Sequence, residues 1–275
     1  AGRRGGQPAG AARAHGIPLV VEALWWGATG MASYALYLFF FTGYSITAEG
    51  VHRALGVYGS PNNLALLLER VVPMLLAVTA FGWPAGSPRH ALRRGSYGLA
   101  LLINLAALLL TFSRGALWLG LPAAVLFMGV MRGRRVLAAW LAALAVAVAS
   151  ALPLLGSDRL RLLFSGEAGT SFFRLRVWQS AWTMLGEHPW LGVGSLALFI
   201  WLQVSFWRLA LPLYRHLSEG QPRALILGLM ASMLAGLAHG LVDHALFLVD
   251  LAYIFGLTLA VVANTVGDVE HTCKG

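Results

Sequence analysis

The sequence predicts an all-α membrane protein, a helical bundle with about eight transmembrane spans. Hydrophobic residues make up 58% of the 275 residues and charged residues only 11%, and the mean hydropathy of +0.71 is far above that of a soluble domain. Apolar runs of about 20 residues recur along the chain, and this is the length that a helix needs to cross a bilayer. Short basic clusters separate many of these runs, as is typical of the ends of membrane spans.

The predicted spans are apolar runs bounded by charged or turn residues. Prolines inside several of them are compatible with a membrane helix, because neighbouring helices satisfy the freed carbonyl groups. Only the three residues "SRG" at 113–115 separate the third run from the fourth, which predicts a very tight hairpin. The spans are expected at 17–41, 64–81, 95–112, 116–131, 136–155, 196–214, 224–242 and 246–262.

The distribution of Lys and Arg predicts the orientation, because short loops rich in these residues stay on the cytoplasmic side. Basic residues precede the first span, follow the last, and lie in the loops after the second, fourth and sixth spans. An even number of crossings separates these positions, so all of them fall on one side. We therefore expect a basic cytoplasmic segment at 1–16 and a transmembrane bundle at 17–266, in which 156–195 forms a periplasmic segment.

Charge and cysteine content exclude several classes of partner. The formal net charge of +9 does not indicate nucleic acid binding, because the basic residues flank apolar runs. The single cysteine, Cys273, cannot form an internal disulfide and has no neighbours suited to a metal site. The sequence thus predicts no metal, no cofactor and no nucleic acid partner, and membrane lipids are expected to surround the chain.

A second set of arginines falls on the opposite, outer side, where the orientation rule does not require them. Fixed positive charge there suits an anionic substrate, because the guanidinium fork can grip phosphate oxygens with two hydrogen bonds. For Arg114, at the tip of the predicted hairpin, an interfacial anchor is the alternative. The outer arginines are Arg53, Arg70, Arg114, Arg159, Arg161, Arg174 and Arg176.

The second span begins after "GSPNNLA" at 59–65, which predicts a turn followed by a helix. Asn62 and Asn63 are expected to cap that helix, since asparagine is a favoured N-cap residue. Arg53 precedes the start of this helix, and it is a candidate for contact with an anion.

Charged residues also occur inside the second span, where charge is costly. Glu69 and Arg70 are adjacent and therefore point about 100° apart on a helix, so each is expected to face a different neighbour or a wet cavity. A structural ion-pair role and the lining of a substrate cavity both remain open. His239 and Asp243 share a face if their helix persists, which predicts a hydrogen-bonded pair, with an acid–base role as the alternative. The candidate substrate-binding residues are Arg53, Arg70, Arg114, Arg174, His239 and Asp243.

The segment "RLRVWQSAWTMLGEHPWLGVG" at 174–194 is a polar, tryptophan-rich interruption between spans. Arg174, Trp178 and Trp182 share one face of a predicted amphipathic helix. Such a helix could lie on the outer leaflet surface, where this face would serve as an aromatic anchor or as a contact for an anion. The proline and glycines of "EHPWLGVG" end that helix.

Four motifs in this order resemble the O-antigen ligase and O-antigen polymerase family of bacterial envelope glycosyltransferases. They are "GVYGSPNNLA", "TFSRGALWLG", "RLRVWQSAWTMLGEHPWLGVG" and "GLAHGLVDHALFLVDLA", and the resemblance runs from about His52 to Asn264. It implies a helical bundle in the bacterial inner membrane that moves a glycan from an undecaprenyl-diphosphate carrier to an acceptor at the periplasmic face. Arg114 and Arg174 match family arginines that would neutralise the diphosphate leaving group, and Arg53 is a weaker candidate.

The resemblance also implies features that these residues lack. In the family, the "GVG" turn precedes a periplasmic loop with a His-Asn motif, whose histidine is the proposed base. Here Ser195 leads directly into the next span, and no His-Asn dipeptide occurs. The catalytic residue is therefore unknown. The chain is either a degenerate relative or a sequence without that loop and the first spans, and the direct junction favours the second explanation.

Three functions remain in competition at this point. The first is an O-antigen ligase with lipid A-core as acceptor, and the polymerase, whose acceptor is a second lipid-linked repeat unit, is its close alternative. A transporter or flippase is suggested by the intramembrane charges, although the internal repeats on which many transporters are built are absent from the sequence. A non-catalytic scaffold would be compatible with the absent loop.

Overall fold

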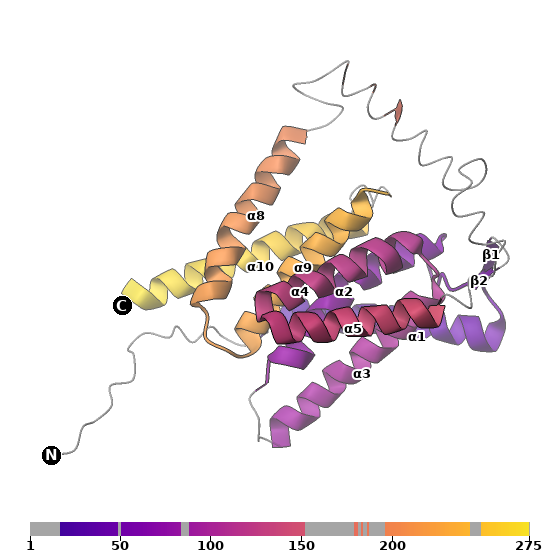
Figure 1. Ribbon diagram of the computed structural model, residues 1–275, viewed down its shortest axis with the longest axis horizontal. Coiled ribbons are helices and arrows are strands. Elements are labelled where there is room, and N and C mark those ends of the chain that lie inside the picture. The colour runs from indigo at the N-terminus through magenta and orange to yellow at the C-terminus, as the bar shows by residue number, and fades with distance from the viewer. Residues whose placement is uncertain are drawn as a thin grey trace. The chain divides into compact units, whose positions relative to one another are not determined.

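The computed structural model describes residues 17–48, 51–83, 88–151, 179–180, 183, 186, 196–242 and 249–274. It divides into one compact unit formed by Ala1–Met128 and Arg208–Gly275 and a second formed by Gly129–Trp207. Regular structure in the described part is almost all helical (Figure 1). The predicted all-α class is therefore confirmed.

Helix α2 (Pro61–Phe81) lies at the centre of the first unit. It packs against α1 (Leu19–Tyr37), α3 (Pro88–Leu110), α9 (Gln221–Gly240) and α10 (Val249–Lys274). Every residue from 64 to 75 is buried, so this helix is covered on all sides. A helix that is apolar around its whole circumference needs such a central position, and the two charged residues inside it must find their partners within the protein.

Helices α1 and α3 pack through a polar contact as well as through apolar surface. The Asn104 side chain of α3 donates to Oγ1 of Thr29 on α1 over 2.8 Å, and both side chains are buried. Near the other end of the interface, the Tyr97 hydroxyl donates to the Glu22 carboxylate over 2.5 Å. Hydrogen bonds between helices are a common means of association where lipid leaves little hydrophobic driving force.

Between α1 and α2 the chain forms elements that the sequence did not predict. The π-helix η1 (Leu38–Thr42) extends α1, and the strands β1 (Ile46–Ala48) and β2 (Val51–Arg53) form an antiparallel pair. Ile46 pairs with Arg53 and Ala48 with Val51. Such short strands lack the alternating pattern that would reveal them in the sequence, and the backbone of Ala54 then bonds to the carbonyl of Leu110 at the end of α3.

Among the residues that the structure describes, three helical segments are long and apolar enough to cross a membrane, by length and composition alone. They are Pro61–Phe81, Gly115–Arg132 and Gln221–Gly240. A row of leucines on α3 is also largely exposed, with Leu99, Leu102 and Leu109 each more than half accessible. Exposed apolar rows of this kind suit contact with lipid. The described chain is thus a helical membrane protein, and the number of eight spans remains a prediction.

The second unit contains the end of α4 (Leu121–Arg132), all of α5 (Arg134–Ala151) and the first part of α8 (Leu196–His216). Gly133 has a φ of 106°, and it forms the turn between α4 and α5. A side chain at Gly129 would meet the Leu137 backbone at 2.9 Å, so α4 and α5 approach closely at this position. The predicted span at 116–131 is helical, and the predicted span at 136–155 is helical over its described part, which ends at Ala151.

Candidate functional site

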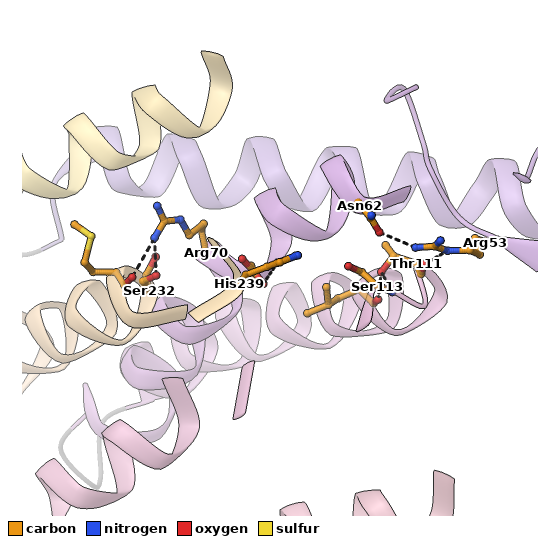
Figure 2. Close-up of polar contacts among 10 residues, drawn as sticks. Arg53, Asn62, Arg70, Thr111, Ser113, Ser232 and His239 are labelled. Carbon is orange, nitrogen blue, oxygen red and sulfur yellow. Dashed lines mark hydrogen bonds and ion pairs between the residues drawn. The ribbon is translucent and has the colours of Figure 1, made fainter. Parts of the chain in front are cut away.

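Two polar clusters line α2, one at its beginning and one deeper in the helix (Figure 2). We call the first the turn cluster, formed by Arg53, Asn62, Thr111 and Ser113. We call the second the core cluster, formed by Glu69, Arg70, Ser232 and His239. Together they contain or adjoin most of the candidate site residues that fall within the described structure.

Arg53, the last residue of β2, links three elements in the turn cluster. Its Nε donates to the backbone carbonyl of Thr111 over 2.6 Å, and its Nη2 donates to Oδ1 of Asn62 over 2.8 Å. The side chain is half-buried. A rigid planar guanidinium suits a contact with two acceptors in fixed directions. Arg53 thereby joins the hairpin to the start of α2 and to the turn after α3.

The start of α2 differs from the sequence prediction. Ser60 is the N-cap, and its Oγ accepts a hydrogen bond from the backbone N–H of Asn62 over 3.2 Å. Pro61 occupies the first helical turn, where its missing N–H costs nothing. The prediction that Asn62 and Asn63 cap the helix was therefore wrong, because Ser60 takes that position and places both asparagines inside the helix. The Asn62 side chain instead accepts from Arg53.

The predicted hairpin between α3 and the next helix is present and turns at 111–113. Helix α3 ends at Leu110, and Phe112 has a φ of 47°. The Thr111 hydroxyl donates to the Leu108 carbonyl over 2.6 Å and accepts from the Ser113 N–H over 3.2 Å. These local bonds replace helical ones, which is how threonine and serine stabilise turns.

Arg114 stands immediately after this turn and begins the next helical segment. Its backbone is helical, with φ −62° and ψ −41°, and it precedes the π-helix η2 (Gly115–Gly120), which continues into α4. Its side chain is half-buried. Ser113 beside it is completely buried, and within the described residues its Oγ has no hydrogen-bond partner. The structure thus places Arg114 at a helix start, next to the turn cluster.

In the core cluster, Glu69 and Arg70 point to different partners on α9, as their adjacent positions predicted. Oε2 of Glu69 lies 2.8 Å from Nδ1 of His239, a residue 170 positions away in the chain. Nη1 of Arg70 donates to the carbonyls of Ser232, at 2.8 Å, and Met233, at 3.5 Å. Both Glu69 and His239 have an exposed fraction of 0%, and Arg70 is 4% exposed.

Small residues on α9 make room for these contacts. Gly228, Ser232, Gly236 and Gly240 recur at every fourth position, which places them along one side of the helix. A side chain at Gly236 would overlap the Arg70 guanidinium, and one at Gly228 would meet the α2 backbone at Met74. Small residues at this spacing are a known signal of close helix packing in membranes. This spacing is visible in the sequence, and it could have predicted that α9 packs closely against another helix.

The remaining candidate residues have different outcomes. Arg174 and Asp243 lie outside the described residues, so the predicted pairing of His239 with Asp243 remains a prediction. Sequence reasoning missed the partnership of His239 with Glu69, although it singled out both residues. Within the part of the chain that the structure describes, no three His, Cys, Asp or Glu side chains gather as a metal site would require.

The comparison with known proteins connects these clusters to a family. Residues 99–225 match the family model described as O-antigen ligase. No curated protein and no solved structure matches the chain. The matched range contains the turn after α3, Arg114, η2 and the segment around Arg174. The motif resemblance is therefore confirmed over residues 99–225, which are similar to the O-antigen ligase family.

Proposed function

We propose that this protein is a glycosyltransferase of the O-antigen ligase type in the bacterial inner membrane. It transfers a glycan from an undecaprenyl-diphosphate carrier to an acceptor such as lipid A-core at the periplasmic face. The observation that carries the proposal is the family match over 99–225, which includes Arg114 at a helix start beside the turn cluster. An O-antigen polymerase, which uses the same donor and a second lipid-linked repeat unit as acceptor, is the alternative.

In this proposal Arg114 and Arg174 contact the diphosphate of the donor. Breaking the bond to the glycan leaves negative charge on the diphosphate, and a preorganised guanidinium stabilises that charge in the transition state. A helix start favours anions as well, since its N–H groups and dipole point toward them. Arg53 is the weaker candidate for direct contact, because Thr111 and Asn62 already bond two of its nitrogens.

The core cluster argues against a transport pathway as the main function. Arg70 and His239 were predicted to bind substrate, yet their described contacts join α2 to α9, and both side chains are buried. We therefore assign them to helix packing, and Asp243 remains a substrate-binding candidate.

The decisive test is a glycan-transfer assay in proteoliposomes with a lipid-linked glycan as donor and lipid A-core as acceptor. Arg114→Ala and Arg174→Ala are expected to lower transfer by about a hundredfold or more, the usual effect of removing a group that stabilises transition-state charge. Arg135→Ala is the control, since this exposed residue of α5 lies outside the proposed site. Unchanged transfer in both test variants would refute the diphosphate contacts.

The same assay separates ligase from polymerase. A ligase attaches the glycan to lipid A-core, whereas a polymerase lengthens the lipid-linked glycan when no lipid A-core is present. The proposed topology, with 156–195 periplasmic and 1–16 cytoplasmic, is testable by cysteine labelling in a Cys273→Ser background. A membrane-impermeant maleimide added to intact spheroplasts should label Ser165→Cys and not Ser87→Cys, and the reverse pattern would invert the orientation.

A further inference from the structure

The π-helix η2 has an unusual relation to the core cluster. It begins directly after Arg114, and it packs against both α2 and α9. A π-turn is wider than an α-turn, is intrinsically unfavourable, and occurs frequently at functional sites. The π-helical conformation of η2 therefore requires neighbouring residues that hold its backbone in place.

Both ends of η2 are glycines, and each faces one member of the buried pair. A Cβ at Gly115 would overlap the imidazole of His239. A Cβ at Gly120 would overlap the carboxylate of Glu69 and come within 3.2 Å of the Ala235 carbonyl. The backbone of η2 thus rests on the pair at both ends, and only glycine leaves space for this approach.

The pair itself has a fixed geometry. Glu69 and His239 are both completely buried and lie 2.8 Å apart, on two helices that each meet the length and composition of a membrane span. A buried polar pair is expensive, so its benefit lies in fixing one arrangement of its helices more than in stability. Here that arrangement includes the surface on which η2 rests.

We propose that Glu69 and His239 are positioning residues for Arg114. The pair holds the two ends of η2, and η2 in turn fixes the direction in which the Arg114 guanidinium meets the donor diphosphate. This inference rests on the proposed function. A displacement of about 1 Å in a group that contacts the reacting atoms can cost about a hundredfold in rate, so the contact at Gly115, one residue after Arg114, bears directly on catalysis.

Single variants test the proposal with matched controls, compared at equal amounts of folded protein in proteoliposomes. Gly120→Ala and Glu69→Ala are expected to lower kcat about tenfold or more with a smaller change in the donor KM, because the charge that Arg114 neutralises develops as the bond breaks. Gly98→Ala on α3 is the control, since its Cβ would make an ordinary 3.7 Å contact with Thr79. Glu69→Gln, which keeps a hydrogen bond to His239, should retain kcat within about threefold.

A double-mutant cycle separates this inference from the proposed function. If Glu69 acts through Arg114, then Glu69→Ala and Gly120→Ala should each change kcat by less than about threefold in an Arg114→Lys background, whereas independent effects would multiply. Full multiplication overturns the positioning role and leaves the diphosphate contact intact. A full loss in Glu69→Gln also overturns it, because that result assigns the carboxylate a chemical role. Normal transfer by Arg114→Ala overturns the positioning role too, because Arg114 would then have no part in the reaction, whereas absence of transfer by the parent protein refutes the proposed function itself.

Discussion

The two clusters along α2 use arginine in different ways. In the turn cluster, half-buried Arg53 donates to one backbone carbonyl and one side-chain amide, and so connects a hairpin, a helix start and a turn. In the core cluster, Arg70 is nearly inaccessible and donates to carbonyls of a neighbouring helix. The difference shows that an arginine in a membrane protein cannot be assigned to substrate from its charge alone, because helix carbonyls compete for the same donors.

The clusters also differ in what surrounds them. The turn cluster joins short local elements, whose backbone groups are not all satisfied by regular structure. The core cluster lies between two long helices, where glycine and serine on α9 allow the polar side chains to fit. We therefore expect loss of Arg70 in the core cluster to act mainly on folding. Changes in the turn cluster should act on the placement of Arg114, as should changes in the Glu69–His239 pair.

The largest effect should come from Arg70→Ala. This change removes a buried guanidinium while leaving Glu69 in place, and breaking one member of a buried charged group costs about 3–5 kcal/mol. Unfolding in detergent by denaturant titration would measure the lost stability. Arg94→Ala serves as the control, since this residue is exposed near the start of α3. An equal stability for Arg70→Ala and the parent protein would show that the α9 carbonyls do not stabilise the fold through this contact.

An intermediate effect is expected from Arg53→Ala. The variant loses bonds from a charged donor to Thr111 and Asn62, each worth about 1.5–3 kcal/mol when buried and less at this half-buried site. We expect a loss of about 1–2 kcal/mol in unfolding free energy, smaller than that of Arg70→Ala, and a reduced kcat for transfer. Asn62→Ala should reproduce part of both losses. If Arg53→Ala is the more destabilising of the two arginine variants, the distinction between the clusters is wrong.

The smallest effect should come from the start of α2. Ser60→Ala removes the N-cap acceptor and should cost about 1 kcal/mol. Asn63→Ala should change stability by less than about 0.5 kcal/mol, because the asparagine is inside the helix and not at its cap. Thermal unfolding of the two variants in the same detergent would compare them. A larger loss of stability in Asn63→Ala than in Ser60→Ala would instead support the sequence prediction that Asn63 caps the helix.

Local pattern was sufficient for much of the fold. The helical class, the positions of α2 and α9, the tight turn before Arg114 and the divergence of Glu69 from Arg70 all follow from composition, run length and helix geometry. The family resemblance likewise rested on short motifs, two of which surround the "SRG" turn and Arg174. These features depend on neighbours within a few residues, which the sequence displays directly.

Only the tertiary structure decided which polar groups meet. His239 has a candidate partner four residues away in Asp243, yet the structure brings it to Glu69, 170 positions earlier. Likewise, Arg53 contacts Thr111 because the β1–β2 hairpin places it there, and the sequence pattern did not predict this hairpin. The physical reason is that apolar helices in lipid have many nearly equivalent ways to associate, and close packing of small residues with satisfied polar groups selects among them. The sequence by itself therefore determined the helices and the family resemblance, and three-dimensional packing determined the clusters around Arg114.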